Sequence, residues 1–296
     1  MKAVALLLLA TTAYAGAPVD RPEAFEVDRE APPPGQGEFS FDGGGPVAFW
    51  AADVQLLYLD RPMSLRTMEL ERFPVRRRET LALGGALSIG SSIVIDARFP
   101  MAHQVGDRLN DLGDERPLDR WVLGDLGMGV RLRIATLEYF SAFTRGHVTF
   151  GTGDDHDFAG EARFTIAWMV IGRFTPSEDW VIAANVGVRF RGAEVKVADR
   201  LLGDELFANL GATYALPAWP GLWCEANHMR AAAELVGVLG NNVAGQRGPS
   251  PVEARLGFIG QFRSWLGFAF RVGKGLDDHI GAPRFRAMFE LIYEPE

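Results

Sequence analysis

The chain contains long stretches in which apolar and polar residues alternate one by one. In "LGDLGMGVRLRI", residues 123–134, alternate positions from residue 126 onward are apolar, and the positions between them hold glycine and arginine. Successive side chains of a β-strand point to opposite sides, so this period of two predicts a strand with one apolar face. That face would meet a core in a soluble sandwich and lipid in a membrane barrel, and one strand does not decide between them.

The same alternation recurs from residue 47 to the end of the chain and predicts twelve strands. Clear examples are "WVIAANVGVRFR" at 180–191 and "LFANLGATYA" at 206–215, whereas the strand near 221–232 is ambiguous in phase. The predicted strands lie near residues 47–60, 79–90, 92–101, 122–134, 136–149, 161–174, 180–191, 205–216, 221–232, 252–263, 265–274 and 284–293.

The connections between these strands alternate between long and short. Short connections are expected near residues 91, 135, 175–179, 217–220 and 264, with long ones between them. This pattern is typical of outer-membrane barrels, which have short periplasmic turns and long outer loops. An even number of strands also closes the sheet, which leaves no unpaired edge in the bilayer. We therefore predict an all-β fold, a closed antiparallel up-and-down transmembrane β-barrel of about twelve strands, with both termini on the short-turn side.

Aromatic residues gather at the short-turn ends of the predicted strands. They are Trp50, Phe174, Trp180, Tyr214, Trp219, Trp223, Trp265 and Tyr293. Belts of Trp and Tyr mark membrane–water interfaces, so this placement favours lipid on the apolar face. Trp265 is out of phase with the outward residues of its own strand. A soluble periplasmic β-protein stays open as an alternative, because alternation alone is common to both classes.

The N-terminal region divides into two further segments. "MKAVALLLLATTAYAGAP" has a basic start, a short apolar run and an Ala-x-Ala site, so residues 1–15 are predicted to be a secretory signal peptide. Residues 16–46 are rich in Pro, Gly and acidic residues, and we expect an irregular segment that is either a tail or a plug in the lumen. The barrel is expected to span residues 47–296. The single cysteine, Cys224, excludes an internal disulfide.

Charged residues on the inward phase of the predicted strands form the candidate site. The expected lumen-lining residues are Arg98, Arg131, Arg133, Arg163, Arg189, Arg191, Glu253, Arg255, Arg271, Arg284, Arg286 and Glu290. They indicate either a channel lining with some anion preference or a polar network that fills the barrel and blocks conduction. Barrels of about eight strands are filled and those of about sixteen are open, so twelve strands leave both interpretations open.

Three other functions have weaker signals in the sequence. The outer loops near 110–119, 151–161 and 275–281 are acidic, but their spacing fits no EF-hand, so solvated loops are expected and no metal site. His156 and His279 lie beside carboxylates, which keeps a hydrolase at the outer rim as an alternative. Catalytic motifs of serine hydrolases, zinc proteases and P-loop enzymes are missing, and the net charge of −8 argues against nucleic acid. We therefore expect no enzyme, no catalytic residue and no cofactor.

Several phrases in order along the chain resemble the N-terminal barrel region of certain OmpA-family outer-membrane proteins of Gram-negative bacteria. They include "LGDLGMGVRLRI", "VTFGTGDDHDFAGE", "PVEARLGF" and "GAPRFRAMFELIY". The resemblance implies a barrel in the outer membrane with periplasmic termini. Because the chain ends at Glu296, we expect no peptidoglycan-binding domain. The expected function is passive passage of small solutes or a structural role, with lipid, lipopolysaccharide and the barrel-assembly machinery as partners.

Overall fold

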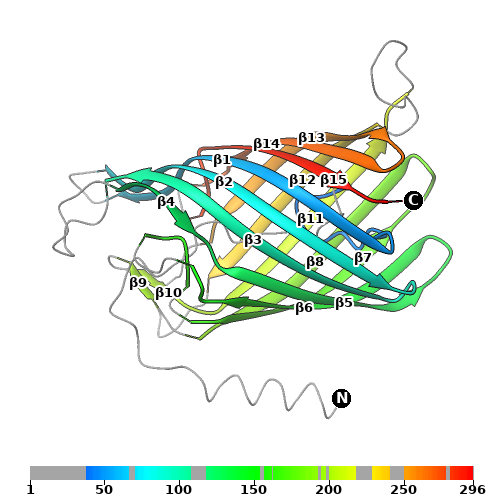
Figure 1. The fold of residues 1–296 in the computed structure, drawn as a ribbon, viewed down its shortest axis with the longest axis horizontal. Coiled ribbons are helices and arrows are strands. Elements are labelled where there is room, and N and C mark those ends of the chain that lie inside the picture. The colour runs from blue at the N-terminus through cyan, green and yellow to red at the C-terminus, as the bar shows by residue number, and fades with distance from the viewer. Residues whose placement is uncertain are drawn as a thin grey trace.

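A computed structural model describes residues 38–66, 71–107, 118–153, 157–161, 163–192, 195–197, 200–217, 229–240, 250–277 and 281–295. Strands account for most of these residues and form one closed antiparallel barrel (Figure 1). Within these ranges, no helix is long and apolar enough to cross a membrane.

The barrel wall is an up-and-down meander. Its strands are β1 (Trp50–Arg66), β2 (Glu71–Ile89), β3 (Ile93–Gly106), β4 (Leu118–Leu123), β5 (Leu126–Thr136), β6 (Phe140–Phe150), β7 (Thr165–Phe174), β8 (Trp180–Arg191), β11 (Glu205–Ala215), β12 (Arg230–Gly240), β13 (Val252–Arg263), β14 (Leu266–Gly275) and β15 (Phe285–Tyr293). A separate hairpin, β9 (Val195–Val197) and β10 (Arg200–Leu202), lies in the connection between β8 and β11. Because β4 and β5 pair with successive parts of β3, the described wall is twelve strands around, which confirms the predicted fold class.

The ring closes through its first and last strands. β1 and β15 pair in an unbroken register from Ala52 opposite Tyr293 to Asp60 opposite Phe285. β1 therefore begins, and β15 ends, at the end of the barrel that carries the short turns between β2 and β3 and between β13 and β14. Closure leaves no free strand edge in the wall, as a bilayer requires.

A β-bulge divides the strand predicted at 122–134 into β4 and β5. Phe99 and Pro100 of β3 lie opposite three residues, 124–126. Pro100 has no N–H to donate, so only its carbonyl pairs here, accepting from the Gly124 N–H at 2.9 Å. The extra residue shifts the inward phase from even positions in β4 to odd positions in β5. The predicted single strand is thus wrong at this one point.

The ninth predicted strand is wrong in position. β12 covers Arg230–Gly240 rather than 221–232, and the connection before it spans 216–229 instead of the short 217–220. In "RAAAELVGVLG" alanines occupy both faces at the start of the strand, so period-two contrast is weak there. Trp219 and Trp223 lie outside the described residues.

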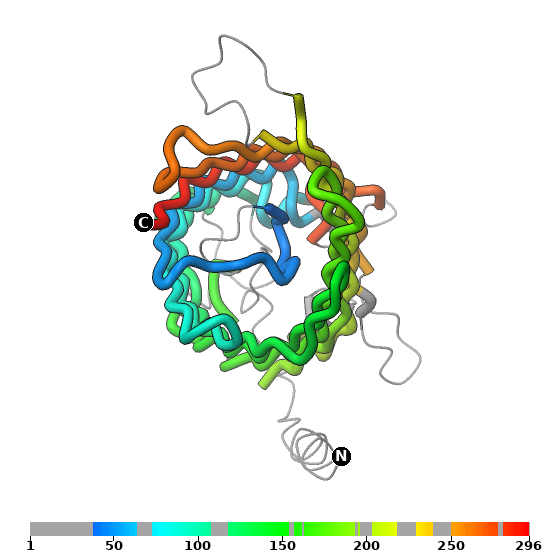
Figure 2. The backbone as a smooth tube through the Cα atoms, turned by 90° about the vertical axis from the view of Figure 1, so that its right-hand side faces the viewer, coloured from blue at the N-terminus to red at the C-terminus, as the bar shows by residue number. Residues whose placement is uncertain are grey.

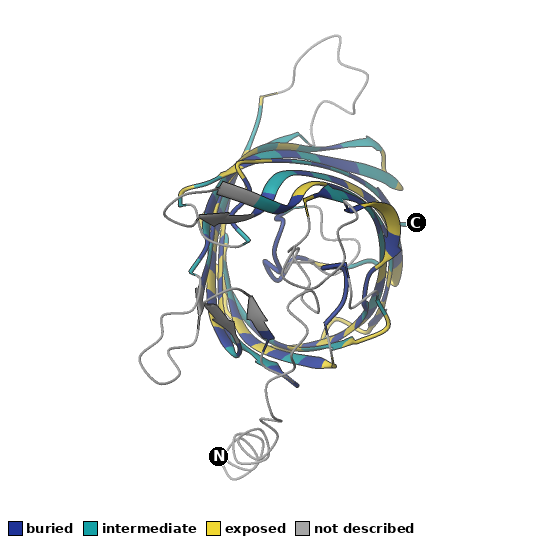
Figure 3. Cartoon of the chain, turned by 90° about the vertical axis from the view of Figure 1, so that its left-hand side faces the viewer, coloured by how far each residue is buried: buried dark blue, intermediate teal, exposed yellow. Residues whose placement is uncertain are grey.

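The outer surface of the wall is apolar over its whole circumference. Large hydrophobic side chains point away from the barrel on strand after strand; Leu83, Val130, Val186, Leu210 and Leu256 are examples. The strands accordingly alternate between buried and exposed residues along their length (Figure 3). An exposed apolar surface of this extent excludes a soluble sandwich and suits lipid.

Aromatic residues mark both edges of this apolar band. At the short-turn end the ring centroids of Trp50 and Tyr293 lie 5.3 Å apart, and those of Trp180 and Tyr214 4.9 Å apart, as predicted. Trp265 lies in the β13–β14 turn, 5.7 Å from Tyr293, which explains its irregular phase. The length of β1 between Trp50 and Tyr58 is ~26 Å at roughly 3.3 Å per residue. This length is enough for a tilted strand to span an outer-membrane apolar band.

Candidate functional site

A segment of the chain crosses the inside of the barrel before β1 begins. Residues 38–46, here called the strap, run through the middle of the ring in the view down the barrel (Figure 2). Phe39 and Phe41 of the strap are buried, stack at 5.1 Å between centroids, and pack on Val181 and Ala183 of β8. Residues 16–46 are predicted to be either a tail or a plug; residues 38–46 of this segment lie inside the lumen, and residues 16–37 lie outside the described residues.

Polar residues of the strap alternate with these rings and bind the wall. The Ser40 N–H donates to Glu234 Oε1 at 3.0 Å, and Arg255 Nη1 donates to Ser40 Oγ at 2.6 Å. Arg131 Nη1 donates to Asp42 Oδ1 at 3.0 Å. The wall partners come from β12, β13 and β5, so the strap is tied to well-separated parts of the barrel.

The end of the strap nearer the short turns is held by its first acidic residue. The Glu38 carboxylate forms an ion pair with Arg173, and its Oε1 lies 3.8 Å from Arg230 Nε. Thr213 Oγ1 donates to the same carboxylate at 3.3 Å. Strap contacts therefore extend from the short-turn end to the middle of the lumen.

Three arginines of the wall depend on the strap for a counter-charge. Among the described residues, the carboxylates that contact Arg131, Arg173 and Arg230 all belong to the strap. By contrast, Arg98 has a wall partner in Asp53 at 2.7 Å. Arg131 is buried, and an unpaired buried charge is costly, whereas Arg173 and Arg230 are part-exposed and depend less on the strap.

A second segment folds into the opposite mouth of the barrel. Residues 157–161, here called the inner loop, belong to the connection between β6 and β7, and Phe158 in it is fully buried with φ of 57°. The Phe158 carbonyl accepts from Arg78 Nη1 at 3.1 Å, and the Asp157 carbonyl accepts from Gln104 Nε2 at 2.6 Å. The inner loop thus narrows the mouth against β2 and β3.

The bulge residue Asp125 anchors the inner loop. Its carboxylate accepts from the N–H groups of Gly153 and Glu161 at 2.8 and 2.7 Å. Glu161 in turn pairs with Arg191 of β8. Asp157 was expected in a solvated outer loop, and this is wrong, because its side chain is buried and pairs with Arg120. Asp154, Asp155 and His156 lie outside the described residues.

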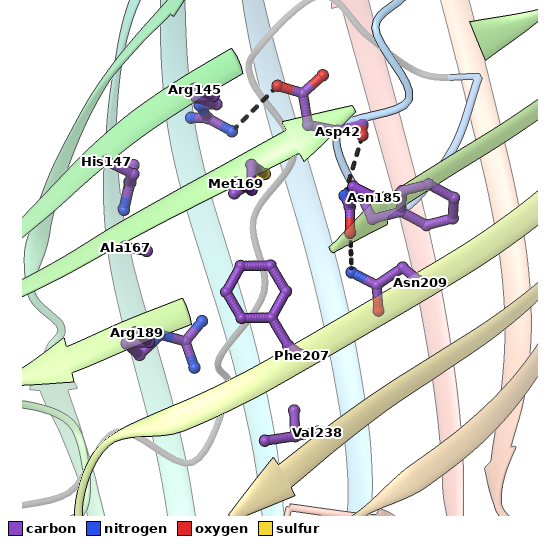
Figure 4. Close-up of a pocket in the computed structure, with 11 residues that line it drawn as sticks. Asp42, Arg145, His147, Ala167, Met169, Asn185, Arg189, Phe207, Asn209 and Val238 are labelled. Atoms are coloured by element: carbon purple, nitrogen blue, oxygen red, sulfur yellow. Dashed lines mark hydrogen bonds and ion pairs between the residues drawn. The ribbon is translucent and has the colours of Figure 1, made fainter. Parts of the chain in front are cut away.

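A small chamber of about 50 Å³ adjoins the strap (Figure 4). Its polar lining includes Arg145, His147, Arg189 and Asn185, and its apolar lining includes Phe207. Figure 4 shows the side chains converging from β6, β8 and β11. The Asn185 side chain donates to the Asp42 carbonyl at 3.0 Å and accepts from Asn209 at 2.8 Å. The chamber therefore has polar and apolar side chains side by side in its lining.

Most of the predicted lumen residues lie inside the barrel, in a network of charges of opposite sign. Those on inward positions of the wall are Arg98, Arg131, Arg189, Arg191, Glu253, Arg255, Arg271, Arg286 and Glu290. Examples of their contacts are Arg286 Nε to Glu253 Oε1 and Arg271 Nε to Glu234 Oε1, both at 2.8 Å. Whether these residues line a path for solute stays a prediction.

Three predicted lumen residues lie at the ends of the barrel. Arg133 is exposed at the short-turn mouth, with its guanidinium carbon 5.8 Å from the Phe143 ring centre. Arg163 and Arg284 are exposed at the other mouth, just outside the strands. These three are at the entrances rather than inside the network.

Several network members were missed from the sequence. Two of them are Arg145, which pairs with Asp96 at 2.6 Å, and Glu205, which pairs with the predicted Arg189 at 2.8 Å. Asp53 of β1 and Arg145 of β6 sit at inward positions, so strand phase alone could have found them. No local signal identifies Glu38 and Asp42, because their partners are distant in the chain. Within the described residues, no cluster of His, Cys, Asp or Glu is arranged to hold a metal ion.

Comparison with known proteins supports the fold and nothing finer. No family model and no curated protein matches the sequence. The barrel is similar to an outer membrane channel from Pseudomonas putida F1, with TM-score 0.62, 16% identity, and coverage of 88% of this chain and 98% of the other. It is also similar to the NanC porin, with TM-score 0.54, 7% identity, and coverage of 83% and 100%. The chain therefore has the fold of outer-membrane β-barrels of the channel and porin type.

Proposed function

We propose that this protein is a passive channel for small solutes that is closed at rest by its own strap. The observation that carries the proposal is that a polar, charged lumen is filled by a segment that takes part in no β-ladder within the described residues. Within the described residues, side chains of the wall hold the strap, so it can leave without breaking a β-ladder of the wall. The structural neighbours are called channels and porins, which supports the same class.

The proposed location is the outer membrane of a Gram-negative bacterium, with both termini in the periplasm. Support comes from the common end at which β1 begins and β15 ends, and from the short turns at that end. Insertion by the barrel-assembly machinery and contact of the other end with lipopolysaccharide are parts of this proposal. The resemblance of sequence phrases to OmpA-family barrels stays a prediction.

The competing hydrolase has no support from the described residues. His156 and His279, the two histidines that suggested it, lie outside them. The lumen instead contains paired arginines and carboxylates, which suit selective passage of charged solutes.

The test of the channel is single-channel conductance in a planar bilayer. A Cβ at Gly211 would lie 2.6 Å from the Phe39 ring, so Gly211→Val must displace this ring, and we expect it to weaken the seating of the strap without removing any charged side chain. The matched control is Gly146→Val, because a Cβ there has no neighbour within 4 Å. We expect Gly211→Val to give discrete, anion-selective steps, and the wild type and the control to stay mostly closed. A Gly211→Val protein that inserts, shows barrel-type heat modifiability and is silent would contradict the proposal.

A further inference from the structure

We infer that the strap occupies the binding site of the channel's solute, and that this solute is an organic anion with an apolar ring or chain. The inference rests on the proposed channel function and adds the class of solute to it. The strap would then be an internal competitor: a carboxylate-bearing, phenyl-bearing segment seated where such a solute binds.

The charges of the strap and the wall favour an anion as the solute. Arg131, Arg173 and Arg230 receive their carboxylates from the strap alone, among the described residues. When the strap leaves, the wall keeps these arginines and loses two negative charges, those of Glu38 and Asp42. Unpaired charges in a narrow lumen are costly, so an anion that replaces these carboxylates makes strap release easier. A cation or an uncharged solute supplies no such replacement.

The shape of the site under the strap favours a solute with an apolar ring or chain. Beside the arginines the wall offers an apolar patch of Val181, Ala183 and Val236, and Phe39 and Phe41 cover it. Gly211 leaves the room that the rings need, since a Cβ there would lie 2.6 Å from Phe39 and 3.1 Å from Phe41. Because Phe39 follows Glu38 and Phe41 precedes Asp42, the site accepts a ring close to a carboxylate.

The chamber gives a carboxylate access to the wall arginines beside the strap. The chamber adjoins Asp42, the last acidic residue of the strap (Figure 4). In the described structure Arg145 Nε donates no hydrogen bond, and Asp42 Oδ2 accepts none and lies 3.7 Å from Arg145 Nη1. The chamber is small, so only the carboxylate end of a solute enters it, and there it can bind Arg145 through a free donor before Asp42 is released. Further approach lets it replace Asp42 on Arg131.

Competition between strap and solute predicts the concentration range. Solute that binds only when the strap is out shifts the equilibrium toward the open state. The strap is attached to the barrel, so its effective concentration is on the order of millimolar. A small anion should therefore open the channel at millimolar rather than micromolar concentration.

The experiment measures strap release directly in the full chain. Ser40 is buried, so in a Cys224→Ser background a Ser40→Cys variant should react slowly with a membrane-impermeant maleimide. We expect 10 mM benzoate to increase the labelling rate severalfold, acetate to increase it less, and benzyl alcohol to leave it unchanged. Equal effects of benzoate and benzyl alcohol, or no effect of benzoate, would overturn the inference.

Two further measurements keep the test independent of the cysteine variant. In planar bilayers, benzoate should raise the open probability of the unmodified chain, and Arg131→Gln should abolish this response while Arg133→Gln at the mouth preserves it. If Gly211→Val conducts but benzoate opens neither the wild type nor Arg133→Gln, the solute class is wrong and the channel stands. If Gly211→Val is also silent, the channel function itself is wrong.

Discussion

Asp42 sets the energetic balance of the lumen at the scale of single residues. Its carboxylate is buried against the equally buried guanidinium of Arg131. Removing one partner of a buried pair leaves the other charge uncompensated, whereas an exposed pair contributes little. The stability of the seated strap should therefore depend strongly on this residue.

Asp42→Asn tests that dependence. We expect it to lower the stability of the strap-in state by about 3 kcal/mol and so to increase labelling of the Ser40→Cys site. The control is Asp107→Asn, because Asp107 and Arg76 form an exposed pair at 2.7 Å whose loss should cost at most about 1 kcal/mol. Urea unfolding in lipid vesicles and the labelling rate are the measurements, and equal effects of the two variants would argue against a strap held by charge.

Prediction from sequence at this scale succeeds where strand phase decides the direction of a side chain. Arg131, Arg255 and Arg271 were placed in the lumen because every second residue of a strand faces inward. Their partners could not be predicted in this way. Arg131 binds Asp42 and Arg255 binds Ser40 across 89 and 215 residues of chain. No local pattern encodes such pairs, so the strap could be named as a plug or a tail but not assigned to either.

The bulge between β4 and β5 is the most informative irregularity at the scale of elements. A Cβ at Gly124 would lie 2.7 Å from Pro100 Cγ, so the bulge needs glycine opposite this proline. Gly124→Ala should cost about 1–3 kcal/mol through overpacking, and Pro100→Ala in the same chain should restore most of it. A double-mutant cycle by urea unfolding measures the coupling, and strictly additive effects would show that the contact does not constrain the bulge.

The inner loop acts in series with the strap. Asp125 accepts from two N–H groups of the connection that contains the inner loop, so Asp125→Ala should release it. Alone, this variant should stay closed because the strap still crosses the lumen; combined with Gly211→Val it should conduct more than Gly211→Val alone. Asp119→Ala is the control, since its side chain is 68% exposed. A conductance unchanged by Asp125→Ala in the Gly211→Val background would place the narrowest point elsewhere.

Element positions were predictable where the two faces differ in polarity. β8 (Trp180–Arg191) and β13 (Val252–Arg263) begin and end where the alternation does. The strand predicted at 221–232 was misplaced relative to β12, because Ala231, Ala232 and Ala233 give both faces of β12 the same polarity at its start. The bulge was missed for another reason: "LGDLG" keeps its alternation on each side, and the phase shift follows from Pro100 on the neighbouring strand.

At the scale of the whole molecule, the barrel follows from the even number of strands and from the need to pair backbone groups inside the bilayer. An even antiparallel meander can close, and closure pairs the two strand edges that would otherwise lie in a bilayer without water. The strand number and the aromatic residues at the short-turn end were therefore predictable from sequence. The position of the strap in the lumen was not predictable, because it depends on charges that meet only after the barrel has closed.

The depth of the apolar band gives the last prediction. Leu210 points outward from the middle of β11, whereas Trp121 points outward from β4 near the long-loop end of the wall. A charge facing lipid costs most at the bilayer midplane, so Leu210→Arg should lower stability by about 2–4 kcal/mol and Trp121→Arg by about 0–1 kcal/mol. Urea unfolding of the refolded barrel in lipid vesicles measures both. Equal costs would mean that the two positions lie at the same depth, and the band drawn between Trp50 and Tyr58 would then be wrong.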